Sequence, residues 1–395
     1  MKLKETEQGR HCRNQILQSE EMSNQFKNNI KNTKNISTNN STIRNTPKKK
    51  SSIVSKFLNF LFYPIMIGFI GGLFLMYGPY NGFRDWYITT AMTTMSHQYL
   101  ATWFYSDKTI NEVLDKNKII EIDAITDPTL VTTTASTGKV TYANEYEKAI
   151  LEKDPANPDY KIIEIEEDKF SGYIAAVYDA SKIQTLVTSR LNVSGQFVTT
   201  MAKNKNAVLA INGGFFVDLK EDRTGGTPLG ITISNGKILT SGSSTTQSNL
   251  VGFSEDNKLV IGKMTLSEAK KMKIRDAVTS EPFLIINGEA STVVGNGGWG
   301  TAPRTAIGQR QDGIVLFLVI DGRRVGKPGA TMEDVIEIMQ RYGAYNASAL
   351  DGGTSSVMVE NYEIINDPID SDGVHKTRPV ATAFGLILDE RKNDD

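Results

Sequence analysis

The stretch that decides the fold is IVLFLVIDGRR, which runs from Ile314 to Arg324. Its first seven residues, Ile314–Ile320, are all apolar, a pattern typical of a strand that is buried on both faces within a sheet. Asp321 and Gly322 follow directly, so this strand carries a carboxylate at its end. We therefore expect a sheet-based domain in which a polar turn follows a central strand.

A helix is predicted after this strand. Thr331 is a suitable N-cap, acidic residues fill the first turn, and Gly343 ends the helical pattern. The chain then passes through the apolar residues Ala347–Leu350 into DGGTSSVM at 351–358. A second strand is therefore expected to end in a carboxylate, here followed by two glycines and several hydroxyl side chains.

Shorter elements are predicted nearer the N-terminus. The expected strands are Ile174–Tyr178, Ile183–Val187, Ala207–Ile211, a hairpin over Ile231–Leu239 with its turn at Asn235-Gly236, and Pro282–Ile286. A helix fits Gly195–Lys203. Together these elements predict a mixed α/β (α+β) domain, a mixed β-sheet flanked by helices.

Several polar motifs follow the predicted strands, and each has a structural alternative. The glycines of NGGFF (212–216) would let backbone amides approach a ligand, although a tight turn with core aromatics explains this motif by itself. A flexible loop, 295–300, leads to Arg304, and Arg378 precedes the last strand. A guanidinium in such a place binds a phosphate or a carboxylate, or forms a surface ion pair. His375 is either a proton donor or a solvated loop residue.

The two strand-end carboxylates, Asp321 and Asp351, are candidates for an acid, a base or a metal ligand, and polar turns are the alternative. A divalent cation, Ca²⁺ or Mg²⁺, is the ion that such hard oxygen ligands would bind. Three widely separated His and one Cys exclude a zinc cluster, a disulfide framework and a Cys–His dyad in the main domain. The sequence requires no cofactor.

Charge is distributed unevenly along the 395 residues, whose formal net charge is −1. Residues 1–56 hold 12 of the 44 Lys and Arg but 4 of the 45 Asp and Glu, whereas residues 78–395 carry a net −9. A large acidic domain binds nucleic acid poorly, so no nucleic-acid partner is expected. Residues 1–56 have too little apolar surface to offset their ordering entropy, and we predict a disordered basic tail.

The uncharged stretch 57–77 is predicted to be a transmembrane signal-anchor helix in the lipid bilayer. Lysines cluster just before it, and only Arg84 follows it closely, which places the N-terminus in the cytoplasm. The exit from the span has no small-residue cleavage pattern. We expect a single-pass cell-membrane protein with an extracellular C-terminal domain and the sole cysteine, Cys12, inside.

Residues 78–160 are expected to form a juxtamembrane helix and a stalk, and residues 161–395 the main domain. The aromatic-rich residues 81–104 fit a packing element of the exterior domain, a helix at the membrane surface, or a docking site for a cell-envelope protein partner. No chemistry is assigned to the stalk.

One ordered series of motifs carries a resemblance. NGGFF, TPLG, PRTAIG, the long strand into DGR, the capped helix into LDGGTSSVM, and RPVATAFG together resemble the phosphodiester glycosidase family over about residues 170–389. That family includes the enzyme that uncovers mannose 6-phosphate by removing N-acetylglucosamine, and bacterial proteins linked to exopolysaccharide. Thr354 stands where members usually have a third glycine, and Ala349 where they have asparagine. The resemblance implies a mixed α/β domain whose glycine-rich strand ends converge on one cleft.

The resemblance also implies a reaction, hydrolysis of a sugar-1-phosphodiester bond in a cell-surface polysaccharide or glycoconjugate. Catalytic roles are then expected for Asp351 as nucleophile or water-activating base, Asp321 as second carboxylate or metal ligand, and Arg304 on the phosphate. The expected substrate-binding groups are the Asn212 side chain, the amides of Gly213, Gly214, Gly352 and Gly353, the hydroxyls of Ser355 and Ser356, and Arg378.

Two other classes of function fit the same residues. The domain would then be a non-catalytic glycan-binding module, or a scaffold for exopolysaccharide or cell-envelope assembly that works through residues 81–104. We favour the enzyme because two carboxylates and two arginines stand at predicted strand ends, where binding modules more often present aromatic side chains.

Overall fold

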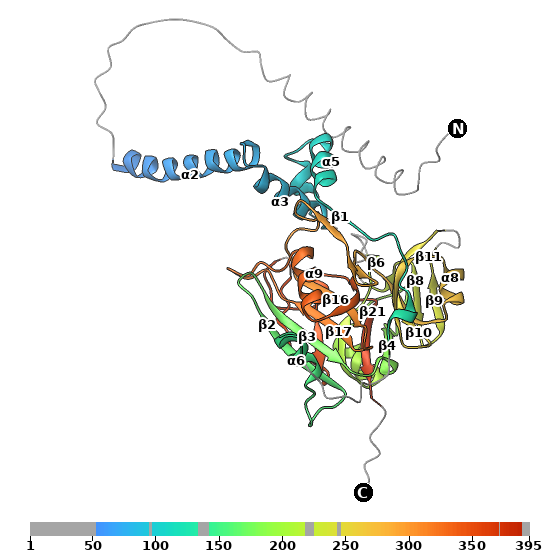
Figure 1. Ribbon diagram of the computed structural model, residues 1–395. Coiled ribbons are helices and arrows are strands. Elements are labelled where there is room, and N and C mark those ends of the chain that lie inside the picture. The colour runs from blue at the N-terminus through green and yellow to red at the C-terminus, as the bar shows by residue number, and fades with distance from the viewer. Residues whose placement is uncertain are drawn as a thin grey trace, which may run out of the picture. The chain divides into compact units, whose positions relative to one another are not determined.

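The computed structural model describes residues 53–94, 97–132, 142–217, 225–242, 246–370 and 372–388 (Figure 1). The chain divides into two compact units, residues 1–69 and residues 70–395. Residues 1–52 of the predicted tail lie outside the described residues. The mixed α+β fold predicted from the sequence is confirmed.

A seven-stranded sheet, here called the central sheet, has the strand order β14-β13-β18-β16-β17-β3-β2. Every pairing within it is antiparallel. Its strands are β2 (Tyr160–Glu166), β3 (Ser171–Val177), β13 (Phe283–Ile286), β14 (Glu289–Ala290), β16 (Arg304–Arg310), β17 (Val315–Ile320) and β18 (Ala344–Ala349). The long apolar run therefore forms an interior strand, β17, between β16 and β3.

Both faces of β17 are buried because different layers cover the two sides of the central sheet. Leu316, Leu318 and Ile320 pack in one apolar cluster with α9 (Met332–Arg341). The alternate side chains, Val315, Phe317 and Val319, belong to a second cluster on the other face. Since side chains alternate along a strand, two covered faces require an uninterrupted apolar run even in an antiparallel sheet.

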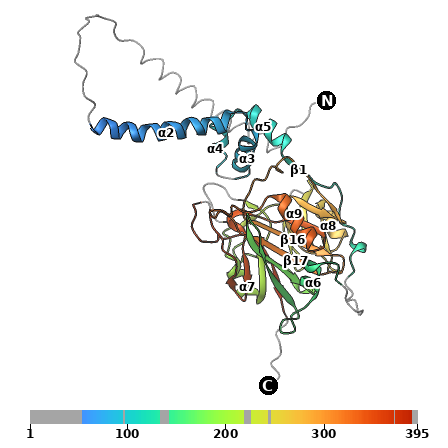
Figure 2. The same ribbon diagram turned by 60° about the vertical axis from the view of Figure 1, so that its left-hand side comes forward.

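The second cluster is shared with two five-stranded antiparallel sheets. The second sheet contains β4 (Ile183–Val187), β5 (Ala207–Asn212), β19 (Met358–Glu360), β20 (Glu363–Ile364) and β21 (Thr382–Ile387). The third contains β8 (Ile231–Ser234), β9 (Lys237–Ser241), β10 (Ser248–Ser254), β11 (Leu259–Met264) and β12 (Ile274–Thr279). Outer helices complete the layers, with α7 (Val198–Lys205) on the second sheet and α8 (Leu266–Lys271) on the third (Figure 2).

Local sequence signals explain where individual elements begin and turn. Thr331 and Asp334 form a capping box at the start of α9, each side chain bonding the other's backbone amide. Asn235 and Gly236 both adopt positive φ, 47° and 74°, between β8 and β9. The predicted hairpin is therefore confirmed with the backbone that a type I′ turn requires.

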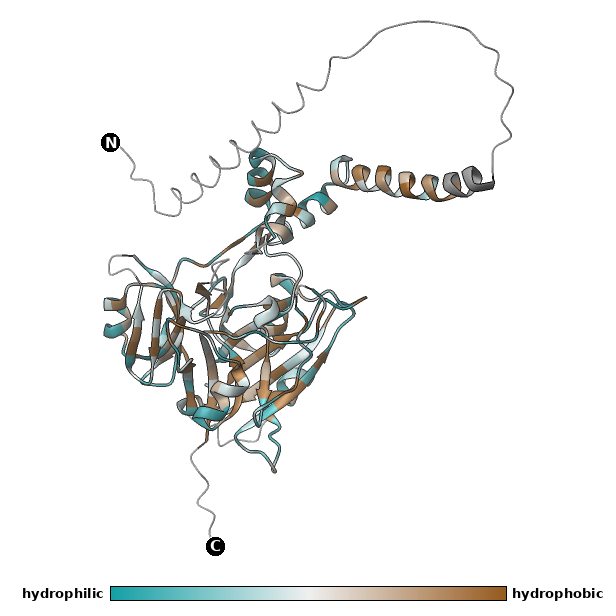
Figure 3. Ribbon diagram, turned by 180° about the vertical axis from the view of Figure 1, so that it is seen from behind, coloured by the Kyte–Doolittle hydropathy of each residue, from teal (hydrophilic) through white to brown (hydrophobic). Residues whose placement is uncertain are grey.

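The helix that contains the predicted span is α2 (Ile53–Tyr77), which starts four residues before the expected boundary. Its stretch Phe60–Tyr77 has a mean hydropathy of 1.9 and is long and apolar enough to cross a membrane. Figure 3 shows apolar colouring along most of this helix. Length and composition thus agree with the predicted anchor.

Three short helices follow: α3 (Asn81–Met92), α4 (Tyr99–Thr102) and α5 (Asp107–Lys116). Residues 81–117 are called the helical cap below. A small apolar cluster that includes Ile88 and Ile110 holds the three helices together. The Tyr105 hydroxyl donates to the Met76 carbonyl at 3.0 Å, and the Tyr77 hydroxyl donates to the Phe104 carbonyl at 2.9 Å. These bonds attach the helical cap to the last turn of α2.

The chain after the helical cap runs along the main domain. Strand β1 (Lys118–Ile120) pairs with β15 (Thr292–Val294). Further on, the Phe283 amide donates to Glu121, and the Thr126 amide donates to the Ile261 carbonyl. The remaining short elements are η1 (Pro128–Leu130), α6 (Glu145–Leu151), η2 (Ala180–Lys182), β6 (Phe216–Val217), β7 (Thr227–Pro228) and η3 (Gly353–Ser355).

Candidate active site

Three neighbouring strands of the central sheet carry, at the same end, the three residues for which catalytic roles are expected. Arg304 begins β16, which lies between β17 and β18 and is antiparallel to both. Asp321 follows the end of β17, and Asp351 lies two residues beyond the end of β18. Because neighbouring strands lie about 4.8 Å apart, the backbones of these two aspartates are separated by roughly 10 Å, with Arg304 between them.

Asn212, the last residue of β5, connects the second sheet to β16 and to the turn that contains Asp351. Its side chain is fully buried, and its Nδ2 donates to the Asp351 carbonyl at 2.6 Å. Its Oδ1 accepts bonds from the Thr305 hydroxyl at 2.7 Å and the Val357 amide at 3.1 Å. Asn212 therefore spans β5, β16 and the 351–357 turn. This arrangement puts the side chain beneath the turn, where it holds Asp351 in place.

The two glycines after Asn212 allow the backbone to pack closely against Thr382 and Thr279. The amide of Gly213 donates to the Thr382 carbonyl at 2.9 Å, and the amide of Gly214 donates to the Thr382 hydroxyl at 3.1 Å. A Cβ on Gly213 would lie 2.6 Å from that hydroxyl, and one on Gly214 would lie 2.5 Å from the Thr279 carbonyl. Both amides, expected to bind a substrate, are thus occupied within the fold.

The 351–356 turn carries the remaining predicted groups. Asp351 is partly exposed, and its amide donates to the Gly213 carbonyl at 3.1 Å. Gly353 adopts a φ of 63°, and its amide donates to the Pro303 carbonyl at 2.9 Å. Ser355 and Ser356 are buried, so their hydroxyls lie below the surface of the turn. The turn therefore presents residues 351–354 at its surface.

Arg304 is almost fully buried, with 6% of its surface exposed. Its Nε donates to the Ala330 carbonyl, and its Nη2 donates to the carbonyls of Trp299 and Gly300, both at 2.7 Å. Burial, together with repulsion from Arg323, lowers the pKa of Arg304 to about 10, against the opposing attraction of Asp334. The guanidinium thus remains charged at neutral pH.

Arg323 is a second cation at these strand ends, and the sequence pattern predicted no role for it. Its Nη1 donates to the Thr354 hydroxyl at 2.7 Å and to the Ile369 carbonyl at 2.8 Å. Desolvation lowers the pKa of Arg323, and Asp370 opposes that shift. Its position directly after the Asp321-Gly322 turn is the signal that could have identified it.

The two guanidiniums flank one turn. A Cβ on Gly353 would lie 3.2 Å from Arg323 Nη2, and one on Gly352 would lie 3.9 Å from Arg304 Nη1. Within the described residues, the hydrogen bonds of both arginines go to carbonyl oxygens and one hydroxyl, and neither forms an ion pair. Two guanidiniums beside the Gly352–Gly353 turn that form no ion pair among the described residues favour the binding of an anion there.

Arg378 contacts β6, a strand of the two-stranded β6–β7 sheet. Its guanidinium carbon is 4.8 Å from the centre of the Phe216 ring, a cation–π contact beside β6. This contact does not test the predicted role of Arg378 in substrate binding.

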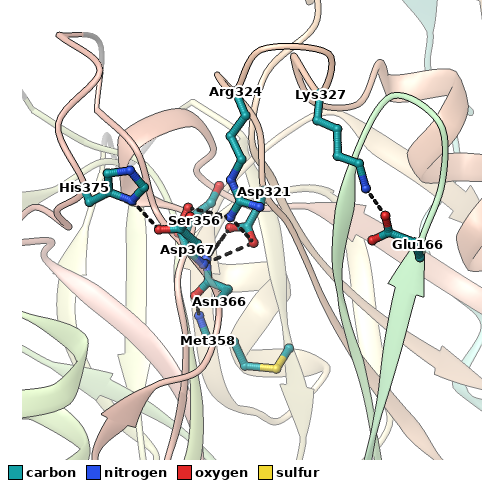
Figure 4. A network of polar contacts seen from close by, with 9 residues as sticks. All are labelled: Glu166, Asp321, Arg324, Lys327, Ser356, Met358, Asn366, Asp367 and His375. Atoms are coloured by element: carbon teal, nitrogen blue, oxygen red, sulfur yellow. Dashed lines mark hydrogen bonds and ion pairs between the residues drawn. The ribbon is translucent and has the colours of Figure 1, made fainter.

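Asp321 belongs to a separate polar network (Figure 4). It accepts bonds from Asn366 Nδ2 at 2.8 Å and the Asp367 amide at 3.1 Å, and Arg324 Nη2 lies 3.4 Å away. Burial raises the pKa of Asp321, and these bonds partly oppose the shift. Arg324 also pairs with Asp367 at 2.7 Å. The hydrogen bonds of Asp321 thus fix residues 366 and 367, which follow β20.

His375 joins the same network from the surface. Its Nδ1 lies 2.6 Å from Asp367 Oδ1, and its side chain is mostly exposed. The Ser356 hydroxyl is buried beside this network and has no hydrogen-bond partner among the described residues. Across that part of the chain, no three His, Cys, Asp or Glu side chains gather as metal ligands. Whether Asp321 and Asp351 bind a divalent cation stays a prediction.

Known proteins resemble the part of the chain that carries these site residues. The family model described as phosphodiester glycosidase matches residues 205–387. An uncharacterized SPbeta prophage-derived protein, YomE, of Bacillus subtilis (strain 168) is 29% identical over 188 residues, which cover 45% of this chain. The match spans 28% of the length of that relative.

A solved structure with the same fold is the catalytic domain of zebrafish N-acetylglucosamine-1-phosphodiester alpha-N-acetylglucosaminidase, auto-inhibited by its pro-peptide. It is 20% identical, covers 67% of this chain and 99% of its own, and superposes with a TM-score of 0.50. The chain therefore resembles the phosphodiester glycosidases in sequence over residues 205–387 and in fold over two thirds of its length.

Proposed function

We propose that this protein is a membrane-anchored glycosidase that hydrolyses a sugar-1-phosphodiester bond at the anomeric carbon. The observation that carries the proposal is the pair of guanidiniums, Arg304 and Arg323, on either side of the Gly352–Gly353 turn and next to the partly exposed Asp351. The family match over residues 205–387 supports a glycosidase-type activity.

The arginines suit the leaving group of this reaction. A phosphodiester is already anionic, and when its bond to the sugar breaks, the bonding electrons leave with the phosphate oxygen. Arg304 and Arg323 would neutralise the charge that grows there, and charge stabilisation of this kind is commonly the largest catalytic effect. A general acid is less necessary, because a phosphate monoester leaves readily.

Asp351 would act at the anomeric carbon of the sugar, on the other side of the bond that breaks. Either its carboxylate attacks the anomeric carbon and water later releases the sugar, or it accepts a proton from water that attacks the same carbon. In both courses water adds across the sugar–oxygen bond, and the products are a free sugar and a phosphate monoester. Asn212 is a positioning residue, because it bonds the Asp351 carbonyl and does not reach the reacting atoms.

The test is release of free sugar from a panel of sugar-1-phosphodiesters by the full-length, detergent-solubilised protein, with and without Ca²⁺ or Mg²⁺. We expect a free sugar and a phosphate monoester in equal amounts. Cleavage at the other phosphate ester bond, which yields a sugar 1-phosphate, would overturn the proposed reaction. Binding of the panel without any turnover would instead favour a non-catalytic glycan-binding module.

Replacing Arg323 by Gln should raise KM by roughly 10- to 100-fold, because a charge-assisted hydrogen bond contributes about 1.5–3 kcal/mol. The main-domain fold should remain, since the change removes two hydrogen bonds, to Thr354 and Ile369, and no ion pair within the described residues. Initial rates over a range of substrate concentrations measure the effect. Arg341→Gln is the control, because it also removes one arginine charge. Arg341 is the last residue of α9 and pairs with Glu167, not with a residue of the proposed site. An equal KM for the two variants would remove Arg323 from the anion site.

The apolar helix α2 supports the anchoring part of the proposal. Exposed aromatic side chains surround its C-terminal end and the helical cap: Tyr77, Tyr80, Trp86, Tyr99 and Trp103. Trp and Tyr are enriched where a protein crosses the membrane–water interface. A membrane-surface position for the helical cap therefore fits these side chains better than docking of a cell-envelope protein.

The sole cysteine tests the orientation. If the N-terminus is cytoplasmic, a membrane-impermeant maleimide should label Cys12 only after the cells are permeabilised. The control places a single cysteine outside, as Lys108→Cys in a Cys12→Ser background, because the Lys108 side chain is 86% exposed. That variant should be labelled in intact cells. Labelling of Cys12 in intact cells would reverse the proposed topology.

A further inference from the structure

The position of Arg304 depends on the loop that precedes it. Residues 295–300, here called the glycine loop, end at the two carbonyls, of Trp299 and Gly300, that accept bonds from Arg304 Nη2. The third bond of the guanidinium goes to Ala330, whose amide and carbonyl are themselves bonded to Ala302. Two of the three bonds that orient this buried cation thus come from the glycine loop.

The glycine loop is in turn bonded to the helical cap, about 180 residues earlier in the chain. The Asn296 amide donates to Asn117 Oδ1 at 2.9 Å, and Asn296 Nδ2 donates to the Thr89 hydroxyl at 3.0 Å. Thr89 is fully buried and Asn117 nearly so. Both bonds therefore lie inside the contact between the helical cap and the glycine loop.

Three glycines allow this contact. Gly295, Gly298 and Gly300 adopt φ values of 63°, 77° and 60°. A Cβ on Gly295 would lie 2.3 Å from Asn117 Oδ1, one on Gly298 the same distance from the Asn117 carbonyl, and one on Gly300 2.6 Å from the Thr90 hydroxyl. The positive φ and the lack of space both exclude larger residues.

The helical cap offers a rigid surface for this contact. Asn117 Nδ2 donates to the Val113 carbonyl at 2.8 Å, which fixes the side chain at the end of α5. The Thr89 hydroxyl donates to the Asp85 carbonyl within α3. Beyond Asn117 the chain enters β1, which pairs with the strand β15 that leads into the glycine loop. The two segments are therefore held together by a strand pair as well as by side chains.

We infer that the helical cap is a positioning element of the anion site, because it holds the glycine loop and, through that loop, the Arg304 guanidinium. This inference rests on the proposed function, in which Arg304 binds the substrate phosphate. Thr89, Asn117 and Asn296 are then positioning residues for Arg304. The hydroxyl bonds of Tyr105 and Tyr77 extend this set of contacts to Met76 and Tyr77, in the last turn of α2.

The test is Gly300→Ala in the full-length, solubilised protein. The added methyl group would press on Thr90 and displace the glycine loop, so KM should rise at least tenfold. Gly297→Ala is the matched control: it lies in the same loop with a φ of 76°, but its Cβ would approach only Val293 and Ile119, at 3.3 and 3.8 Å. Its KM should stay within threefold of the unmodified protein.

A second-site change and a binding measurement separate positioning from a general loss of structure. Thr90→Ala removes the hydroxyl that the new methyl group meets, so the double variant with Gly300→Ala should recover part of the KM loss. The Kd for inorganic phosphate, measured by calorimetry, should weaken at least tenfold in Gly300→Ala and not in Gly297→Ala. If Gly300→Ala does not fold, Asn296→Ala replaces it in both measurements.

The outcomes also separate this inference from the proposed function. If the unmodified protein turns over no substrate but phosphate binding weakens only in Gly300→Ala, the reaction is wrong and the positioning role stands. If sugar is released and Gly300→Ala matches Gly297→Ala in both KM and phosphate Kd, the helical cap does not position Arg304. Equal losses in both variants, without rescue by Thr90→Ala, would also overturn the inference.

Discussion

Asp351→Asn should reduce the rate of sugar release by about 10²- to 10⁴-fold, the range typical for loss of a catalytic base, while KM changes little. Asn has the same size as Asp, and the variant keeps the two backbone bonds of this residue, to Gly213 and from Asn212. The unfolding temperature shows whether the loss of the carboxylate also affects the fold. Only the group that attacks carbon or accepts the proton is removed.

The measurement is kcat and KM for the best substrate of the panel, together with the unfolding temperature. Asp256→Asn serves as the control, because Asp256 is exposed in the turn between β10 and β11 and should leave both constants unchanged. If Asp351→Asn retains more than a tenth of the activity while Arg323→Gln raises KM, the anion site is correct and Asp351 is not the reactive carboxylate.

Asn212→Ala should destabilise the main domain by about 3–5 kcal/mol, because a fully buried side chain that bonds three groups of the fold is removed. These are the Thr305 hydroxyl, the Val357 amide and the Asp351 carbonyl. For a domain of this size such a loss lowers the unfolding temperature by roughly 10 °C. Scanning calorimetry or thermal circular dichroism measures it.

Thr305→Val provides the graded control, since it removes one of the three bonds and keeps the shape of the side chain. Its cost should be about 1 kcal/mol. A small effect of Asn212→Ala, similar to that of Thr305→Val, would mean that the three bonds do not contribute jointly. The ends of the two sheets would then be held together mainly by apolar packing.

Elements with a local signature could be predicted from the sequence. The apolar run into Asp321, the capped helix after Thr331 and the hairpin around Asn235-Gly236 each depend on residues within a dozen positions. The unusual pattern of β17 was informative because layers lie on both faces of the sheet. The strand-end locations of Asp321 and Asp351 followed from the apolar runs before them, whereas β16, the strand that Arg304 begins, was not among the predicted elements.

Contacts between distant segments could not be predicted in the same way. Nothing near Gly213 indicates that Thr382 occupies its amide, and nothing near Arg323 shows that Thr354 and Ile369 accept its bonds. The Gly-rich sequence at 295–300 was interpreted as a flexible loop, whereas its glycines permit a close fit against the helical cap. A glycine serves mobility and tight packing equally well, and only the tertiary contacts distinguish them.

The short connection between α2 and the helical cap limits where the protein can work. Only residues 78–80 separate α2 from α3. The hydrogen bonds from Tyr77 to Phe104 and from Tyr105 to Met76 also hold this short connection against the helical cap. An enzyme on a long linker samples a volume that grows with linker length. With the anchor and the activity proposed above, the active site reaches only as far as its own domain extends, roughly a few tens of ångströms. Its substrates must therefore come to the membrane surface, and bonds in the outer part of a long surface polymer would escape it.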